Sequence, residues 1–141
     1  MYQDKQNTYS QDQAVTASAA STHAFDAGAA GRDIGHGRDL ELVVLCTETV
    51  ASGGASTVQF HLEDSADNSA FSSVVETPAI AKAALVAGAE VLRIRLPSGL
   101  RRYTRLYYTV TTADLTAGRF TAFLTLERQA NRGHPRGYSI A

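Results

Sequence analysis

The chain has 141 residues, and its 13 lysines and arginines against 14 aspartates and glutamates give a formal net charge of −1 at pH 7. That length suits one domain with a core of its own, and the near-zero charge provides no long-range attraction to nucleic acid, an anionic membrane or an acidic substrate. The single cysteine, Cys46, excludes an intrachain disulfide, and no apolar run approaches the roughly 20 residues of a membrane-spanning helix.

The first thirteen residues, MYQDKQNTYSQDQ, are polar and almost free of aliphatic side chains. We therefore expect residues 1–13 to form an extended N-terminal arm that does not fold on its own. The segment lacks the basic and then apolar layout of a secretory signal, which argues against export by the usual route. Tyr2 and Tyr9 would anchor the arm if it crosses a neighbouring subunit, and a frayed terminus is the other interpretation.

Residues 14–47 contain two expected strands separated by a glycine-rich loop. The small residues of 14–25 alternate weakly, which favours an edge strand. The loop 26–39 matches a phosphate-binding loop only superficially, because no apolar strand precedes it and no helix follows it; an irregular surface loop is the better interpretation. Residues 40–47, LELVVLCT, are apolar on both faces, so we expect a covered strand in which Cys46 is a buried small hydrophobe.

Residues 57–64 show the clearest alternation in the chain and predict a half-buried strand with His61 on its outer face. The oxygen-rich turn that follows, DSADNSAF, fits ordinary turn chemistry better than a calcium site, because it has no twelve-residue calcium loop. Short strands are expected at 73–77 and 90–96. Between them, residues 79–88 favour either a single helical turn or an extended connection.

Between Arg101 and Glu127 two alternating stretches are joined by a Thr/Asp/Gly connection, which predicts a β-hairpin. If this hairpin closes symmetrically around Leu115, Tyr107 and Phe123 lie opposite each other on the solvent face. This pair is the first candidate for a protein-contact surface.

The elements together predict an all-β fold, an antiparallel β-sandwich or jelly roll of about seven or eight strands. We expect the sandwich to span residues 14–128, with the arm 1–13 before it and a basic, turn-rich tail at 129–141. A solvated tail is the default, but its cationic side chains could pair with acidic groups of another chain. Those side chains, with the residue just before the tail, are Arg128, Arg132 and Arg136.

The sequence offers no arrangement typical of catalysis or of metal binding. No two histidines have the spacing that presents a pair of zinc ligands, and no G-x-S-x-G elbow marks a hydrolase nucleophile. We therefore expect no enzyme activity, no cofactor and no metal site. The scattered histidines are His23, His36, His61 and His134.

A group of arginines lies beside Tyr103 and Tyr107 and forms a basic stripe in the sequence. Such a stripe could stack on bases or bind a sugar acid. Because the net charge is −1, we assign it to salt links with acidic groups of a protein neighbour. Its members are Arg93, Arg95, Arg101, Arg102 and Arg105.

The order of these elements resembles the capsid cement, or decoration, proteins of certain tailed bacteriophages over about residues 11–129. The phrases that carry the resemblance are AVTASAAST, GRDIG, VQFHLEDSADNSAFSSV, AIAKAALVAG, LPSGLRRYTRLYYTV and TAGRFTAFLTLERQ. The last two are the most specific. The resemblance implies a jelly roll without enzymatic activity that ties neighbouring capsid subunits together, often as a homo-oligomer.

We therefore expect a structural protein of the virion exterior, made in the host cytoplasm. Its expected partners are the major capsid protein and further copies of itself, a dimer before a trimer, with no nucleic acid and no membrane. A carbohydrate- or receptor-binding module is the alternative, because β-sandwiches with exposed tyrosines suit that use. From the analysis of strand faces and termini, the expected protein-contact residues are Tyr2, Tyr9, Tyr103, Arg105, Tyr107, Phe123, Arg128, Arg132 and Arg136.

Overall fold

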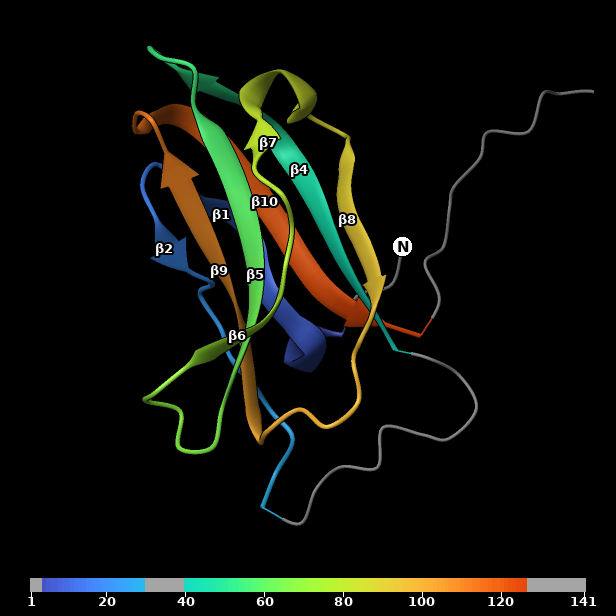
Figure 1. Cartoon of the computed structure of the whole chain (residues 1–141). Helices are drawn as coiled ribbons and strands as arrows, with labels where there is room; N and C mark the ends of the chain where they lie inside the picture. Colours follow the sequence, from blue (N-terminus) through green and yellow to red (C-terminus); the bar gives the residue numbers. More distant parts are fainter. Residues whose placement is uncertain (1–3, 30–39, 127–141) are drawn as a thin grey trace, which may run out of the picture.

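The computed structural model describes residues 4–29 and 40–126, which form two antiparallel sheets packed face to face (Figure 1). Sheet A has the strand order β1-β10-β4-β8, and sheet B has the order β2-β9-β5-β6, with β3 also pairing with β9 and β7 with β5. The all-β sandwich predicted from the sequence is confirmed. The described residues contain ten strands, more than the seven or eight expected, because several edge strands are only two residues long.

The strands of sheet A are β1 (Thr8–Ala14), β4 (Glu41–Ser52), β8 (Glu90–Arg95) and β10 (Leu115–Thr125). The strands of sheet B are β2 (Ala19–Ala20), β3 (Phe25–Asp26), β5 (Thr57–Ser65), β6 (Ser72–Glu76), β7 (Ile80–Ala81) and β9 (Tyr103–Thr111). Two single-turn 3-10 helices, η1 (Lys5–Asn7) and η2 (Lys82–Ala84), complete the elements. In this part of the chain no helix is long and apolar enough to cross a membrane.

The core lies between the two sheets, and its centre is a group of three aromatic rings. Phe60 of β5 contacts Tyr108 of β9 edge-on, with ring centroids 5.7 Å apart, and Phe120 of β10 in the same way at 5.3 Å. Tyr108 and Phe120 stack at 5.6 Å with an interplanar angle of 20°. Because Phe120 belongs to sheet A and the other two rings to sheet B, this group joins the sheets. Cys46 is buried beside this core, as expected.

The predicted hairpin between β9 and β10 is wrong, because the two strands belong to opposite sheets (Figure 1). The chain crosses from sheet B to sheet A through Thr112, whose φ of 80° lies in the left-handed region. In the structure Tyr107 pairs with His61 on β5, and Phe123 pairs with Val43 on β4. Alternating sequence specifies that each stretch is a strand but not which strand it pairs with, so the expected Tyr107–Phe123 pair does not form.

The expectation of an extended arm over 1–13 is wrong for its last six residues, which belong to β1 and pair with β10. Tyr9 has no exposed surface, and its hydroxyl lies 2.7 Å from Thr104 Oγ1 across the sandwich. The buried hydroxyl of Tyr108 donates to Ser10 Oγ at 2.8 Å. Tyr9 and Ser10 follow each other but both face inward, because the pairing register of β1 with β10 shifts on both sides of Ser10. The hydroxyl of each has a hydrogen-bond partner on β9.

Replacing Phe120, the ring of sheet A that packs against sheet B, should lower the stability of the fold. We expect Phe120→Ala to lower the free energy of unfolding by about 3–5 kcal/mol, because a fully buried ring leaves a cavity at the sheet interface. Chemical denaturation measures the change. The control Val86→Ala, at a side chain that is 46% exposed, should change stability by less than about 0.5 kcal/mol. A similar loss in both variants would contradict this account of the core.

The buried tyrosines should make the fold sensitive to alkali. Burial raises the pKa of Tyr108 to about 12, against an ordinary value of 10.0, and it also raises the pKa of Tyr9. The folded chain keeps both protons at pH values where the unfolded chain releases them. The contribution of these tyrosines to stability should therefore be constant below pH 10 and fall as the pH rises toward 12. Urea unfolding at pH 8 to 11.5 tests this, and Tyr108→Phe should flatten the decline relative to its own value at pH 8.

Candidate protein-contact surface

The outer face of sheet B carries a ladder of ring and charged side chains from its two central strands. Along β5 and β9 every second side chain points into the core, and the side chains between them lie on this outer face. The register places His61 beside Tyr107, Glu63 beside Arg105, and Ser65 beside Tyr103. We call the face formed by His61, Glu63, Tyr103, Arg105 and Tyr107 the ring surface.

Arg105 lies at the centre of the ring surface and is held by several neighbours. Its Nε donates to Glu63 Oε2 at 2.7 Å. Its guanidinium carbon lies 3.8 Å from the centroid of the Phe71 ring and 5.8 Å from that of Tyr107. These contacts fix a side chain that is otherwise mobile and leave it only 27% exposed. Sequence reasoning missed Phe71, although a single ring in an otherwise polar turn is a signal for such a contact.

His61 occupies the next row of the same surface, and both of its ring nitrogens have partners. Nδ1 lies 3.2 Å from Glu76 Oε2 of β6, and Nε2 lies 3.0 Å from Thr109 Oγ1 of β9. The imidazole also approaches the Tyr107 ring at an angle of 67°, with centroids 6.5 Å apart. The outward position predicted for His61 is confirmed, and its contacts fix the orientation of the neighbouring tyrosine.

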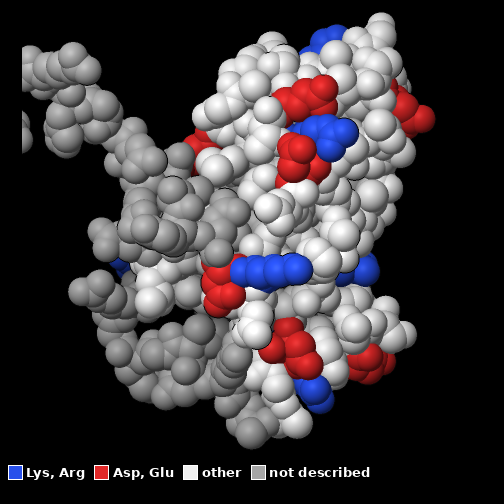
Figure 2. Space-filling view, turned by 180° about the vertical axis from the view of Figure 1, so that it is seen from behind, with Lys and Arg blue, Asp and Glu red and all other residues white. Residues whose placement is uncertain are grey.

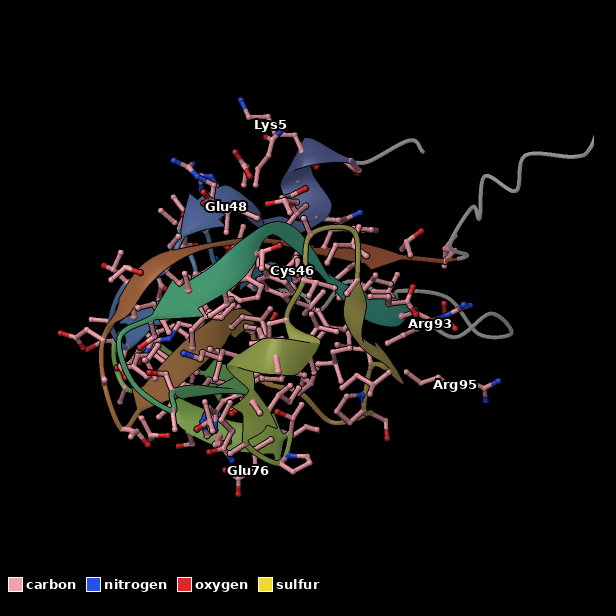
Figure 3. The ribbon with its side chains drawn as sticks, turned by 90° about the horizontal axis from the view of Figure 1, so that it is seen from above. Lys5, Cys46, Glu48, Glu76, Arg93 and Arg95 are labelled. Atoms are coloured by element: carbon pink, nitrogen blue, oxygen red, sulfur yellow. The ribbon has the colours of Figure 1, made fainter. Side chains whose placement is uncertain are left out.

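The arginines predicted to form one basic stripe are divided between the two sheets. Arg93 and Arg95 lie on β8 of sheet A, away from Glu76 on the sheet B side (Figure 3). Salt links of this stripe were expected with another protein, whereas the structure shows ion pairs within the chain. The ion pairs are Arg93–Glu41, Arg101–Asp64, Arg102–Asp26 and Arg105–Glu63.

On the outer face of sheet A, charged side chains likewise form ion pairs with neighbours on adjacent strands. Figure 2 shows this side of the molecule, where several blue side chains lie directly against red ones and most of the remaining described surface is white. Arg119 of β10 lies between Asp12 of β1, at 3.4 Å, and Glu48 of β4, at 3.3 Å. On the described part of this face, positive and negative side chains therefore lie close together and form no broad patch of one sign.

Only part of the predicted contact set is brought together on this surface. Tyr103, Arg105 and Tyr107 share the ring surface, each half-buried. The expectation that Tyr9 and Phe123 present exposed side chains is wrong, since they are 0% and 1% exposed. Four predicted residues lie outside the described part of the chain, namely Tyr2, Arg128, Arg132 and Arg136.

No group of three or more His, Cys, Asp or Glu side chains in residues 4–29 and 40–126 could hold a metal ion. The oxygen-rich turn after β5 is an Asx turn instead. Asp67 Oδ1 accepts hydrogen bonds from the backbone N–H groups of Ser69 and Ala70 and from the hydroxyl of Ser65, and these bonds lower the pKa of Asp67 to about 2. Turn chemistry therefore accounts for the acidic residues of this loop.

A sequence model of the family described as Bbp16 matches residues 9–124. The chain belongs to the Bbp16 family. The match begins in β1 and ends in β10, so the family domain is the whole sandwich and includes the strand that contains Tyr9. The name suggests a phage-related family. No curated protein matches the chain.

The ion pair that closes one end of this Bbp16 sandwich should make its stability depend on acid. Arg101 donates to the buried Asp64 carboxylate through its backbone N–H and its guanidinium, which lowers the pKa of Asp64 below its ordinary 3.8. This stabilisation is present above pH 3.8 and is lost as the pH falls through the lower folded-state pKa.

We expect Asp64→Asn to be less stable than the parent at pH 7 and to lose less stability between pH 5 and pH 2. Urea unfolding across that range measures both effects. If the free energy of unfolding changes with pH in the same way in both proteins, the ion pair of Asp64 does not cause the loss of stability in acid.

Proposed function

We propose that this Bbp16-family protein is a capsid cement protein without enzymatic activity. It binds the outside of an assembled phage capsid and stabilises contacts between major capsid protein subunits. It is made in the host cytoplasm and acts on the virion exterior, with neither nucleic acid nor membrane as a partner. Support comes from the family match, from the resemblance of the LPSGLRRYTRLYYTV and TAGRFTAFLTLERQ phrases to phage decoration proteins, and from the ring surface.

The ring surface is the observation that carries the proposal. Tyrosine and arginine are enriched in protein interfaces because they combine apolar area with hydrogen-bonding groups. Here the side chains are already held in place by Glu63, Phe71 and Glu76, so docking costs little additional side-chain entropy. Each charged group also keeps its own partner when the face is covered, which avoids burying an unpaired charge.

The mechanism of stabilisation is thermodynamic. A protein that binds the assembled lattice but not the released subunits shifts the equilibrium toward the intact shell by mass action. A shell repeats the same site many times, so a cement protein that is itself oligomeric, a dimer in the first instance, gains avidity from weak individual contacts. High affinity at one site is therefore not required of the ring surface.

Truncating either tyrosine of the ring surface should weaken binding to capsids. We expect Tyr103→Ala and Tyr107→Ala each to raise the dissociation constant about tenfold or more, as expected for removing a central interface ring. Co-sedimentation with empty capsids measures the effect. Val86→Ala is the control, because it shortens an exposed apolar side chain in the loop before β8, outside sheet B.

Equal capsid binding by both tyrosine variants and the control would remove the ring surface from the proposal. Binding to glycans with no binding to capsids would instead favour the carbohydrate-binding alternative, in which the same two rings stack on sugars. Circular dichroism and urea unfolding of each variant separate a lost contact from a lost fold.

A further inference from the structure

A pocket of about 420 Å³ opens at the end of the sandwich where the chain passes from β8 to β9. Of its apolar lining residues, Phe25 is buried in the main core, and Ala27, Leu96 and Leu100 are half-buried and pack against that core. This volume lies near the lower end of the range for ligand pockets, and it accommodates one large side chain with its adjoining backbone. The apolar wall is formed by Phe25, Leu96, Pro97 and Leu100.

Two arginines line the same pocket, and no aspartate or glutamate is among its described lining residues. Arg101 uses Nε and Nη2 to bind Asp64 of β5, at 2.9 and 2.6 Å. Arg102 uses the same two nitrogens to bind Asp26 of β3, at 2.8 and 3.0 Å. The two carboxylates therefore fix the orientation of both guanidinium groups before any ligand arrives.

The third nitrogen of each guanidinium, Nη1, has no hydrogen-bond partner within residues 4–29 and 40–126. Both side chains reach solvent, with 42% of Arg101 and 38% of Arg102 exposed. An arginine held in this way can still donate to a further carboxylate, and such charge-assisted bonds are stronger than neutral ones.

We infer that this pocket is a socket for an acidic segment of a protein partner that presents an aromatic side chain next to an aspartate or glutamate. The ring packs against Phe25, Leu96 and Leu100, and the adjacent carboxylate accepts hydrogen bonds from Nη1 of the two arginines. The two Nη1 groups are hydrogen-bond donors, so they select an acceptor such as a carboxylate over a basic group, and the apolar wall selects against a fully polar segment.

The socket opens beside the ring surface, because the guanidinium carbon of Arg102 also lies 4.8 Å from the centroid of the Tyr103 ring. One partner could therefore cover both. Assigning that partner to the capsid rests on the proposed function, whereas the chemistry of the socket does not. The test consequently uses peptides and no capsid, so that failure of the socket and failure of the cement proposal can be told apart.

The probes are two blocked tetrapeptides that differ only in one group, acetyl-Gly-Phe-Asp-Gly-amide and acetyl-Gly-Phe-Asn-Gly-amide. Titration into the ¹⁵N-labelled protein is followed by amide chemical shifts. We expect the aspartate peptide to shift the amides of the lining residues Gly28, Gly99 and Leu100, and the asparagine peptide to bind about tenfold more weakly. Replacing Phe by Ala in the first peptide should abolish saturable binding.

Two variants sharpen the test. Arg102→Gln should remove most of the difference between the aspartate and asparagine peptides, whereas Arg93→Gln should leave it unchanged. Arg93 is the matched control, because it binds Glu41 through the same two nitrogens on the other sheet. Ala27→Phe, which fills the pocket from its own wall, should abolish binding while the remaining amide spectrum shows a folded sandwich.

Equal binding of the aspartate and asparagine peptides to the parent protein would overturn the inference, whatever the variants do. Unchanged amides of the lining residues at the highest peptide concentration would overturn it as well.

Discussion

The stacking of Tyr108 on Phe120 across the two sheets is the interaction on which the rest of the structure depends. Phe60 contacts both rings, so the central strands of the sandwich, β5 and β9 on one side and β10 on the other, are held by one aromatic group. Because every second residue of β5 and β9 must face this group, the residues between them face outward. The position of the ring surface is therefore a geometric consequence of the core.

Much of the strand content could be predicted from the sequence, but the pairing could not. Alternation at 57–64 identified which residues of β5 face the core, and it placed His61 on the outer face, where it lies. The same signal in β9 and β10 suggested a hairpin, because period-2 alternation is identical in a strand that continues its sheet and in one that crosses to the opposite sheet. The pairing of β9 with β5 and of β10 with β4 distinguishes these topologies, and the contacts among Phe60, Tyr108 and Phe120 then join the two sheets.

Polar residues caused the other errors. The segment that contains Tyr9 and Ser10 has too few aliphatic side chains to look like a core strand, yet hydroxyl groups on β9 satisfy both residues inside the sandwich. The arginines appeared as an unpaired basic stripe because their acidic partners, Asp26, Glu41, Glu63 and Asp64, lie far away in the sequence. Composition gives a net charge near zero, and the structure shows that these arginines are neutralised by ion pairs with acidic side chains beside them.

In the proposed function, the sandwich binds the capsid lattice through the ring surface of sheet B, and sheet A packs behind that surface. The most direct test is a cryo-electron microscopy reconstruction of empty capsids mixed with the purified protein. The account predicts additional density on the outer capsid surface that fits the sandwich with the outer face of sheet B, including Tyr103 and Tyr107, turned toward the major capsid protein. Capsids without added density, or a sandwich bound through sheet A with the ring surface facing solvent, would contradict it.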